Sequence, residues 1–339
     1  MKTVIVVDVI SAKVFAVPAC IAGLVLAAPF ALVACGGGGE SGGSAPDTSA
    51  AQCPTDPVDV VVSVDQWGDI VEELGGDCAS VTTVLASSAV DPHDYEPAPS
   101  DAAKFDGARL VVVNGGHYDE WASKLAASSA PDAPVVNALQ AGGADDFHEG
   151  HDQGPEEHSD EGEPNPHVWY KPAAVTGVAD AVIAELSKIA PDAADYFDGR
   201  RAAFAEKMKP YDEAIQSIQA NAAGKTYAAT ESVFDEMAAA LGLVNQTPPG
   251  YQAASANEAE PSPADLDAFL RLLGDRGVDV LIYNVQTEGS VPQQIRAAAE
   301  QAGVPVVEVS ETVPPETDSF ETWQVDQLHA LAAALGVPA

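Results

Sequence analysis

Apolar and polar residues between positions 58 and 136 alternate in a way that predicts short buried strands separated by helices. Mainly apolar runs at 58–64, 81–85, 109–113 and 135–136 predict four strands. Residues 66–74 have helical spacing and end at Gly75-Gly76, and Ser100-Asp101 opens a short helix. This alternation is typical of a parallel α/β sheet, which binds its ligands at the carboxyl ends of the strands.

The remainder of the chain repeats this architecture after a long helical segment. Residues 173–189 and 193–219 have helical spacing, with Pro191 restarting the helix and Pro210 bending it. Strands are expected at 225–230, 278–283 and 304–309, and helices at 232–241, 264–273, 292–301 and 321–335. We therefore predict two α/β lobes with parallel sheets, at 54–170 and 224–339, joined by a long rigid helical spine at 171–223.

The first residues predict where the chain is located. Lys2 and Lys13 precede an apolar segment, 14–33, and Ala34-Cys35 is followed by four glycines. This resembles a bacterial lipoprotein signal, with 1–35 as the signal peptide, Cys35 as the lipid-bearing residue and 36–53 as a flexible tether. The alternative is an uncleaved membrane anchor, because 14–33 is long enough to span a bilayer. Both interpretations place the rest of the chain on the extracytoplasmic face of the cell membrane.

Two cysteines remain for the folded part of the chain. Of the four cysteines, Cys20 lies in the signal and Cys35 would carry lipid, which leaves Cys53 and Cys78. Outside the cytoplasm such a pair is expected to form a disulfide. A two-cysteine metal site is the competing interpretation, and no third cysteine accompanies the pair to support it.

The net charge argues against two kinds of binding partner. The chain has 52 acidic and 15 basic residues and a formal net charge of -37. A surface this acidic argues against nucleic-acid partners and against binding anionic lipid by charge, whereas it suits a protein that binds cations.

Histidines among carboxylates supply the candidate chemistry. An acidic loop, 145–163, carries His148, His151 and His158, and His167 follows it within Asn165-Pro166-His167-Val168-Trp169. Imidazole and carboxylate groups are ligands for divalent transition metals. The loop is therefore interpreted either as an auxiliary site of weak metal capture or as a solvated, disordered insertion.

Several motifs resemble those of a known family. They are Val90-Asp91-Pro92-His93-Asp94-Tyr95-Glu96-Pro97, Asn114-Gly115-Gly116 and the His167 motif after a histidine-bearing acidic insertion. In spacing and residue type they are similar to the solute-binding receptors of zinc and manganese ABC importers. The resemblance covers nearly all of the chain after the tether.

The resemblance implies one metal ion in the cleft between the lobes, held by four side chains: His93, His167, Glu231 and Asp318. Each follows a predicted strand or precedes a helix, where an α/β fold gathers its ligands. Glu231 and Asp318 have an alternative role, because each also stands where an acidic residue caps a helix. Glu260 and Glu288 are the spare carboxylates, and His117 and His329 are expected to be surface or packing residues.

The implied function is high-affinity binding of Zn2+, favoured over Mn2+, and its delivery to an ABC permease with its ATPase. The protein is then expected to be a lipid-anchored monomer and not an enzyme. A surface adhesin or metal buffer on the same scaffold is the alternative. A zinc hydrolase is disfavoured, because no His-Glu-x-x-His motif is present and four protein ligands leave no open position for activated water.

Deleting the acidic loop, 145–163, tests its role. We expect the deletion variant to keep one tightly bound metal equivalent and to lose any weaker second equivalent, because none of the four implied ligands lies in the loop. Native mass spectrometry during a zinc titration measures both. Loss of the tight equivalent would contradict the assignment.

Overall fold

The computed structural model describes residues 52–86, 95–143, 164–257, 259–287 and 289–339. The proposed signal peptide, Cys35 and most of the tether lie outside the described residues, as do His93, the loop histidines and Glu288. The described helices are α1 Asp65–Gly75, α2 Pro99–Lys104, α3 Glu120–Ser129, α4 Ala138–Ala141, α5 Pro172–Ile189, α6 Ala194–Lys207, α7 Lys209–Ala222, α8 Asp235–Ala240, α9 Pro249–Ala256, α10 Pro263–Gly274, α11 Ser290–Ala302 and α12 Phe320–Leu335.

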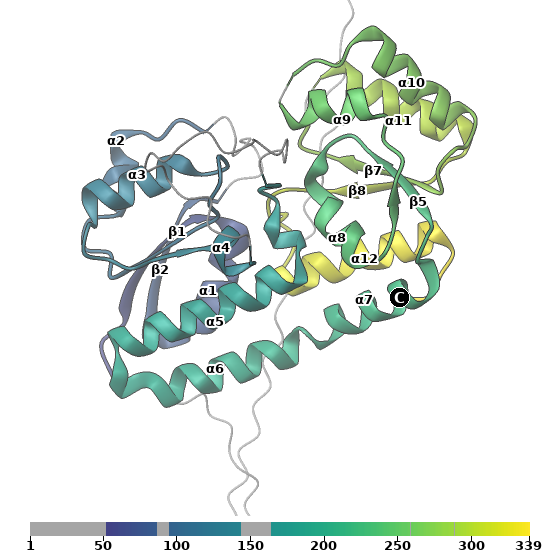
Figure 1. Ribbon diagram of the computed structural model, residues 1–339. Helices are drawn as coiled ribbons and strands as arrows, with labels where there is room; N and C mark the ends of the chain where they lie inside the picture. The colour runs from purple at the N-terminus through teal and green to yellow at the C-terminus, as the bar shows by residue number, and fades with distance from the viewer. Residues whose placement is uncertain (1–51, 87–94, 144–163, 258, 288) are drawn as a thin grey trace, which may run out of the picture. The chain divides into compact units, whose positions relative to one another are not determined.

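The first lobe is built on a parallel sheet of β1 Val58–Val64, β2 Ala79–Leu85, β3 Leu110–Val113 and β4 Val135–Asn137, in the order β2-β1-β3-β4. Side chains alternate between its two faces. Val60 and Val62 belong to the core with α1 and α5, whereas Val61 and Val111 pack with α3 and with Phe105, which directly follows α2. Figure 1 shows the helices on both sides of this sheet. Because helices cover both faces, the central strands β1 and β3 are mainly apolar. The edge strand β2 instead exposes Ser80 and Thr82 between less exposed residues.

The second lobe has the same arrangement. Its strands are β5 Thr226–Ala229, β6 Val244–Asn245, β7 Val280–Asn284 and β8 Val306–Val309, in the order β6-β5-β7-β8, and all pair in parallel. Helices α9, α10 and α11 cover one face, and α8 and α12 cover the other. The predicted α/β class with two parallel sheets is confirmed. Strand β6 was not predicted, because its two residues are too few to form a pattern.

The segment joining the lobes consists of three helices in place of one continuous spine. Helix α5 packs against α1 and α4 of the first lobe, α6 returns along α5, and α7 lies against α12 of the second lobe (Figure 1). The chain turns at Ala190-Pro191, and a break at Met208 precedes Pro210, whose ring does not fit a helix interior. None of the described helices has the length and apolar composition that crossing a membrane requires.

Aromatic residues join the cores of the two lobes. Tyr170 follows His167 in a short 3-10 helix, η2 Val168–Tyr170, and its ring lies 5.2 Å from Phe234 and 5.8 Å from Trp323. Trp169 packs 4.9 Å from Tyr118 on the first-lobe side. These rings are all buried and belong to one continuous hydrophobic cluster. The two lobes therefore share a hydrophobic core where η2 meets α8 and α12.

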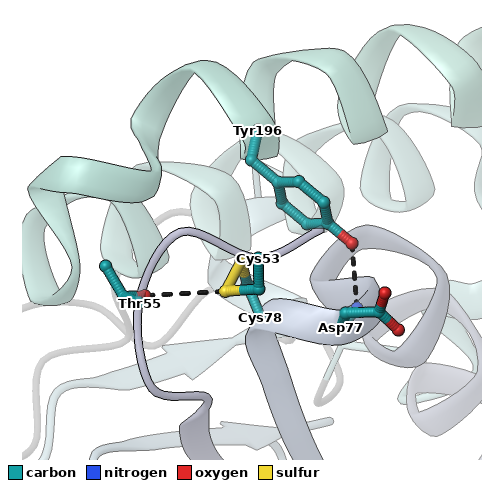
Figure 2. The surroundings of a disulfide bond; sticks show 5 residues. All are labelled: Cys53, Thr55, Asp77, Cys78 and Tyr196. Carbon is teal, nitrogen blue, oxygen red and sulfur yellow. Dashed lines mark hydrogen bonds between the residues drawn. A yellow bond between two sulfur atoms is a disulfide. The ribbon is translucent and has the colours of Figure 1, made fainter. Parts of the chain in front are cut away.

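The expected disulfide is present between Cys53 and Cys78 (Figure 2). It links the start of the described chain to η1 Gly76–Cys78, just before β2, and Cys78 is fully buried. Beside it, the backbone N–H of Asp77 donates a 2.8 Å hydrogen bond to the hydroxyl of Tyr196 on α6. The disulfide therefore fixes the first described residues to the segment after α1. The hydrogen bond between Asp77 and Tyr196 connects the same segment to α6.

Removing the disulfide should lower stability without changing the fold. The cysteines are 25 positions apart, and closing a loop of that size contributes about 3.5 kcal/mol in the chain-entropy model. We expect the double variant Cys53→Ala, Cys78→Ala to lose about that free energy of unfolding in urea. Wild-type protein reduced with dithiothreitol is the control and should unfold at a similar urea concentration; unchanged stability in both would contradict the assignment.

Candidate metal centre

His167 is held in a defined orientation by Asn165. The side-chain oxygen of Asn165 accepts the backbone N–H of His167 at 3.0 Å and lies 2.7 Å from Nδ1 of its ring. An amide oxygen has no proton to donate, so Nδ1 carries the ring hydrogen of the neutral imidazole. The lone pair of the neutral ring is then on Nε2, the nitrogen that faces the second lobe. This is the usual arrangement of a histidine that binds metal.

A second asparagine positions the peptide before His167. The side chain of Asn114 donates to the carbonyl of Pro166 at 2.8 Å and accepts from the indole N–H of Trp67 at 2.9 Å. Its backbone N–H donates to the carboxylate of Asp119 at 2.6 Å. Asp119 is fully buried, and burial raises the pKa of its carboxyl. The predicted Asn-Gly-Gly turn after β3 is thus part of the support for His167.

Gly115 in this turn has a backbone that other residues rarely adopt. Its φ is +89°, and a Cβ at this position would lie 2.3 Å from the side-chain oxygen of Asn137. Glycine is therefore required both by the conformation and by the close approach of β4.

Aromatic rings surround the imidazole. The ring of His167 lies 5.3 Å from that of Trp169 and 6.0 Å from that of Tyr118, both approached edge to face. His167 is only 5% exposed. Burial, and then the nearby carboxylate of Glu311, raise the pKa of Tyr118 well above its usual value. Limited solvent around the imidazole strengthens any electrostatic interaction that it makes.

The second lobe contributes two carboxylates joined by one amide. Glu231 follows β5, Asn284 ends β7 and Glu311 follows β8, and these strands are neighbours in the sheet. The side-chain NH2 of Asn284 donates to Glu231 and, at 2.9 Å, to Glu311. Asn284 and Glu311 are buried, at 2% and 3% exposure. The carboxyl ends of three adjacent parallel strands thus bring two acidic side chains to one place.

The imidazole and one of these carboxylates meet across the lobes. Nε2 of His167 lies 3.7 Å from Oε2 of Glu311. This is too long for a hydrogen bond. Two ligand atoms bound to one tetrahedral zinc ion lie about 3.4 Å apart, given usual bond lengths. The spacing therefore approaches that of two ligands of a shared ion.

Hydrogen bonds from both lobes hold the Glu311 segment in place. The side-chain amide of Gln66, in the first turn of α1, donates to the carbonyl of Glu311 at 3.0 Å. The side-chain oxygen of Gln286 accepts the backbone N–H groups of Glu311 and Thr312, at 2.7 and 3.0 Å. The position of Glu311 thus depends on residues from two separate segments, one in each lobe.

Asp318 is not placed with these groups. It is exposed and lines a depression between α1, α6 and α12, together with acidic residues and one lysine: Asp69, Glu72, Glu73, Glu321 and Lys207. The second-lobe carboxylate beside His167 is that of Glu311, which the sequence analysis did not select. The sequence signal that could have identified Glu311 was its place two residues after a strand, the same relation that Glu231 has to β5.

The other described residues considered from sequence lie at the surface. His117, His329 and Glu260 are exposed. Among the described residues, no three His, Cys, Asp or Glu side chains are grouped closely enough to hold a metal ion. His167 approaches Glu311, and Asn284 links Glu311 to Glu231, whereas His93 lies outside the described residues. His167, Glu231 and Glu311 are the described part of the candidate centre.

Comparisons with known proteins identify the family. Residues 60–334 match the family described as "Zinc-uptake complex component A periplasmic". The chain belongs to this family. The relatives found are metal-binding solute-binding proteins and not enzymes.

Relatives by sequence have zinc-related names. The chain is 28% identical over 264 residues to the "High-affinity zinc uptake system protein ZnuA" of Bacillus subtilis, covering 76% of this chain and 79% of the relative. It is 28% identical over 205 residues to the "Zinc-binding lipoprotein AdcA" of Streptococcus pneumoniae, covering 58% of this chain. That match spans only 39% of the length of AdcA.

Solved structures share the fold at lower identity. FpvC of Pseudomonas aeruginosa, solved in complex with Mn2+, has a TM-score of 0.65 and 20% identity, covering 83% of this chain and 98% of the other. TroA, a periplasmic zinc-binding protein of Treponema pallidum, has a TM-score of 0.66 and 18% identity, covering 82% and 99%. These likenesses show a common two-lobe fold.

The acidic depression makes stability dependent on pH. Burial, and then the carboxylates of Glu72 and Glu321, raise the pKa of Asp69 from 3.8 to about 6. The folded state therefore holds more protons than the unfolded state between these values, and stability is lost as pH rises through them. Asp69→Asn should be more stable than wild type at pH 7.5, and this difference should shrink as the pH falls to 4.5, measured by urea unfolding.

The exposed Asp198 on α6 provides the control, since Asp198→Asn should show no such pH-dependent difference. An equal effect of the two substitutions at both pH values would contradict the assignment.

Proposed function

We propose that this chain is the receptor of a metal importer, which binds one divalent transition metal ion outside the cytoplasm and passes it to a membrane permease. The observation that carries the proposal is the 3.7 Å approach of His167 Nε2 to Glu311 Oε2 from opposite lobes. This pair of buried side chains offers one nitrogen and one oxygen atom, both of them usual ligand atoms for a transition metal. Membership of the zinc-uptake family supports the proposal.

The proposed ligands are His93, His167, Glu231 and Glu311. Glu311 takes the position that the sequence analysis gave to Asp318, because Glu311 is buried beside His167 whereas Asp318 is exposed. Asn284 supports the choice, since its NH2 group reaches Glu311 and Glu231 together. His93, which lies outside the described residues, is included from its sequence motif.

Zn2+ is the favoured ion over Mn2+. A site of two imidazoles and two carboxylates binds zinc more tightly than manganese at equilibrium. Two carboxylates also give the filled site a formal charge of zero with a dication. Four protein ligands complete the tetrahedral shell of zinc and leave no open position for a reacting water, which suits binding and release.

The proposal includes the cellular setting. Cys35 would carry a lipid, residues 36–53 would tether a monomeric two-lobe receptor to the membrane, and an ABC permease with its ATPase would take the metal from it. The lipoprotein name of one relative supports the anchor. Cys35→Ser should release the protein into the soluble fraction of expressing cells, detected by immunoblot after fractionation; unchanged membrane retention would contradict lipidation at this residue.

Ligand variants test the site directly. We expect His93→Ala, His167→Ala, Glu231→Gln and Glu311→Gln each to weaken zinc binding by about 100-fold or more, equivalent to about 2.7 kcal/mol. Each removes one of four bonds to the metal. Isothermal titration with a competing chelator, using zinc and then manganese, measures the affinities.

Asp318→Asn is the matched control and should leave zinc affinity within about threefold of wild type, since the exposed carboxylate lies among other groups. A large loss in Asp318→Asn with none in Glu311→Gln would reverse the assignment of the fourth ligand. Tighter binding of manganese than of zinc would overturn the proposed preference.

A further inference from the structure

Asn165 makes two kinds of contact that no other described residue combines. Its side-chain oxygen lies 2.7 Å from Nδ1 of His167 in the first lobe. Its side-chain nitrogen donates a 2.8 Å hydrogen bond to the carbonyl of Ser232 in the second lobe. Ser232 directly follows Glu231. One half-buried amide thus connects an imidazole to the segment that carries a carboxylate of the other lobe.

The orientation of this amide is fixed from both ends. The backbone N–H of His167 can only donate, so the atom that faces it, at 3.0 Å, is the oxygen of Asn165. The carbonyl of Ser232 can only accept, so the atom that faces it is the NH2 group. A flipped amide would place two donors together at one end and two acceptors at the other.

We infer that Asn165 is a positioning residue, which selects the Nδ1–H tautomer of His167 and aligns its ring with the Glu231 segment across the lobes. In the other tautomer the lone pair of Nδ1 would face the lone pairs of the Asn165 oxygen at 2.7 Å, which is repulsive. In the preferred tautomer the lone pair that can bind a metal ion is on Nε2, the ring nitrogen on the side of Glu311. This inference rests on the proposed function for its effect on metal affinity, and not for its effect on the ring.

An asparagine suits this role better than an aspartate. A carboxylate at position 165 would still accept from Nδ1 of His167, but it would bring a negative oxygen against the carbonyl of Ser232 in place of a donor. Asn165→Asp therefore retains the Nδ1–H tautomer of His167 and removes the hydrogen bond to the carbonyl of Ser232 in the other lobe. Asn165→Ala removes both contacts. The two variants separate the two effects.

The test uses the purified full chain with 15N-labelled histidine, without metal, at about pH 8.5, where imidazole is ordinarily neutral. The ring nitrogens of His167 are assigned by comparison with His167→Ala. We expect wild type and Asn165→Asp to show the Nδ1–H tautomer, and Asn165→Ala to show a mixture. Zinc affinity should fall by about 10- to 100-fold in Asn165→Ala, the usual effect of removing a group that orients a ligand.

Asn245→Ala is the matched control. Asn245 also accepts the backbone N–H of the residue two positions on, Thr247, at 2.8 Å, and it is likewise half-buried. It has no histidine ring among its hydrogen-bond partners in the described structure. We expect this variant to leave the His167 tautomer unchanged and zinc affinity within about threefold of wild type.

The outcomes distinguish the two proposals. An unchanged tautomer in Asn165→Ala would overturn the inference, whatever happens to the affinity. Absence of zinc and manganese binding by wild type would overturn the proposed function, while the tautomer measurement on the metal-free protein would still decide the role of Asn165. An equal loss of affinity in Asn245→Ala would show a general effect of destabilising the fold and would also count against the inference.

Discussion

Two acidic side chains that share one amide group are the constraint on which the centre depends. Glu231 and Glu311 both accept from the side chain of Asn284. Two ionised carboxylates that share one partner repel each other, and low exposure to solvent strengthens that repulsion. A single neutral amide offsets only part of this repulsion. In the proposed function, a divalent cation between them would turn this repulsion into attraction.

Asparagine side chains support each described part of the centre. Asn114 holds the peptide before His167, Asn165 holds the ring, and Asn284 holds the two carboxylates. An amide donates and accepts at once without carrying charge, so it is buried at a lower cost than a carboxylate or an ammonium group. It also adds nothing to the net charge of the site. The formal charge is thus set by the candidate ligands alone.

The shared aromatic core restricts how the two halves move. Tyr170 packs against Phe234 and Trp323, and its hydroxyl group contacts the carbonyl of Ser310, which precedes Glu311. Wide separation of the lobes would expose these buried rings to water, at a cost of about 1.5–3 kcal/mol for each large apolar side chain. Local movement of the loops that carry the ligands avoids that cost. We therefore expect metal entry and release to involve loop rearrangement more than rigid opening.

The sequence by itself indicated most of the elements, the sheet class and the pairing of Cys53 with Cys78, and it singled out the His167 motif. These depend on short-range periodicity and on residue types within one segment, which a sequence records directly. Only the tertiary structure distinguished Glu311 from Asp318 and showed what Asn165 and Asn284 contact. Those choices depend on β5, β7 and β8 lying side by side and on the packing of one lobe against the other. Contacts between residues more than 50 positions apart, such as Asn165 with Ser232, are set by packing and not by any local pattern.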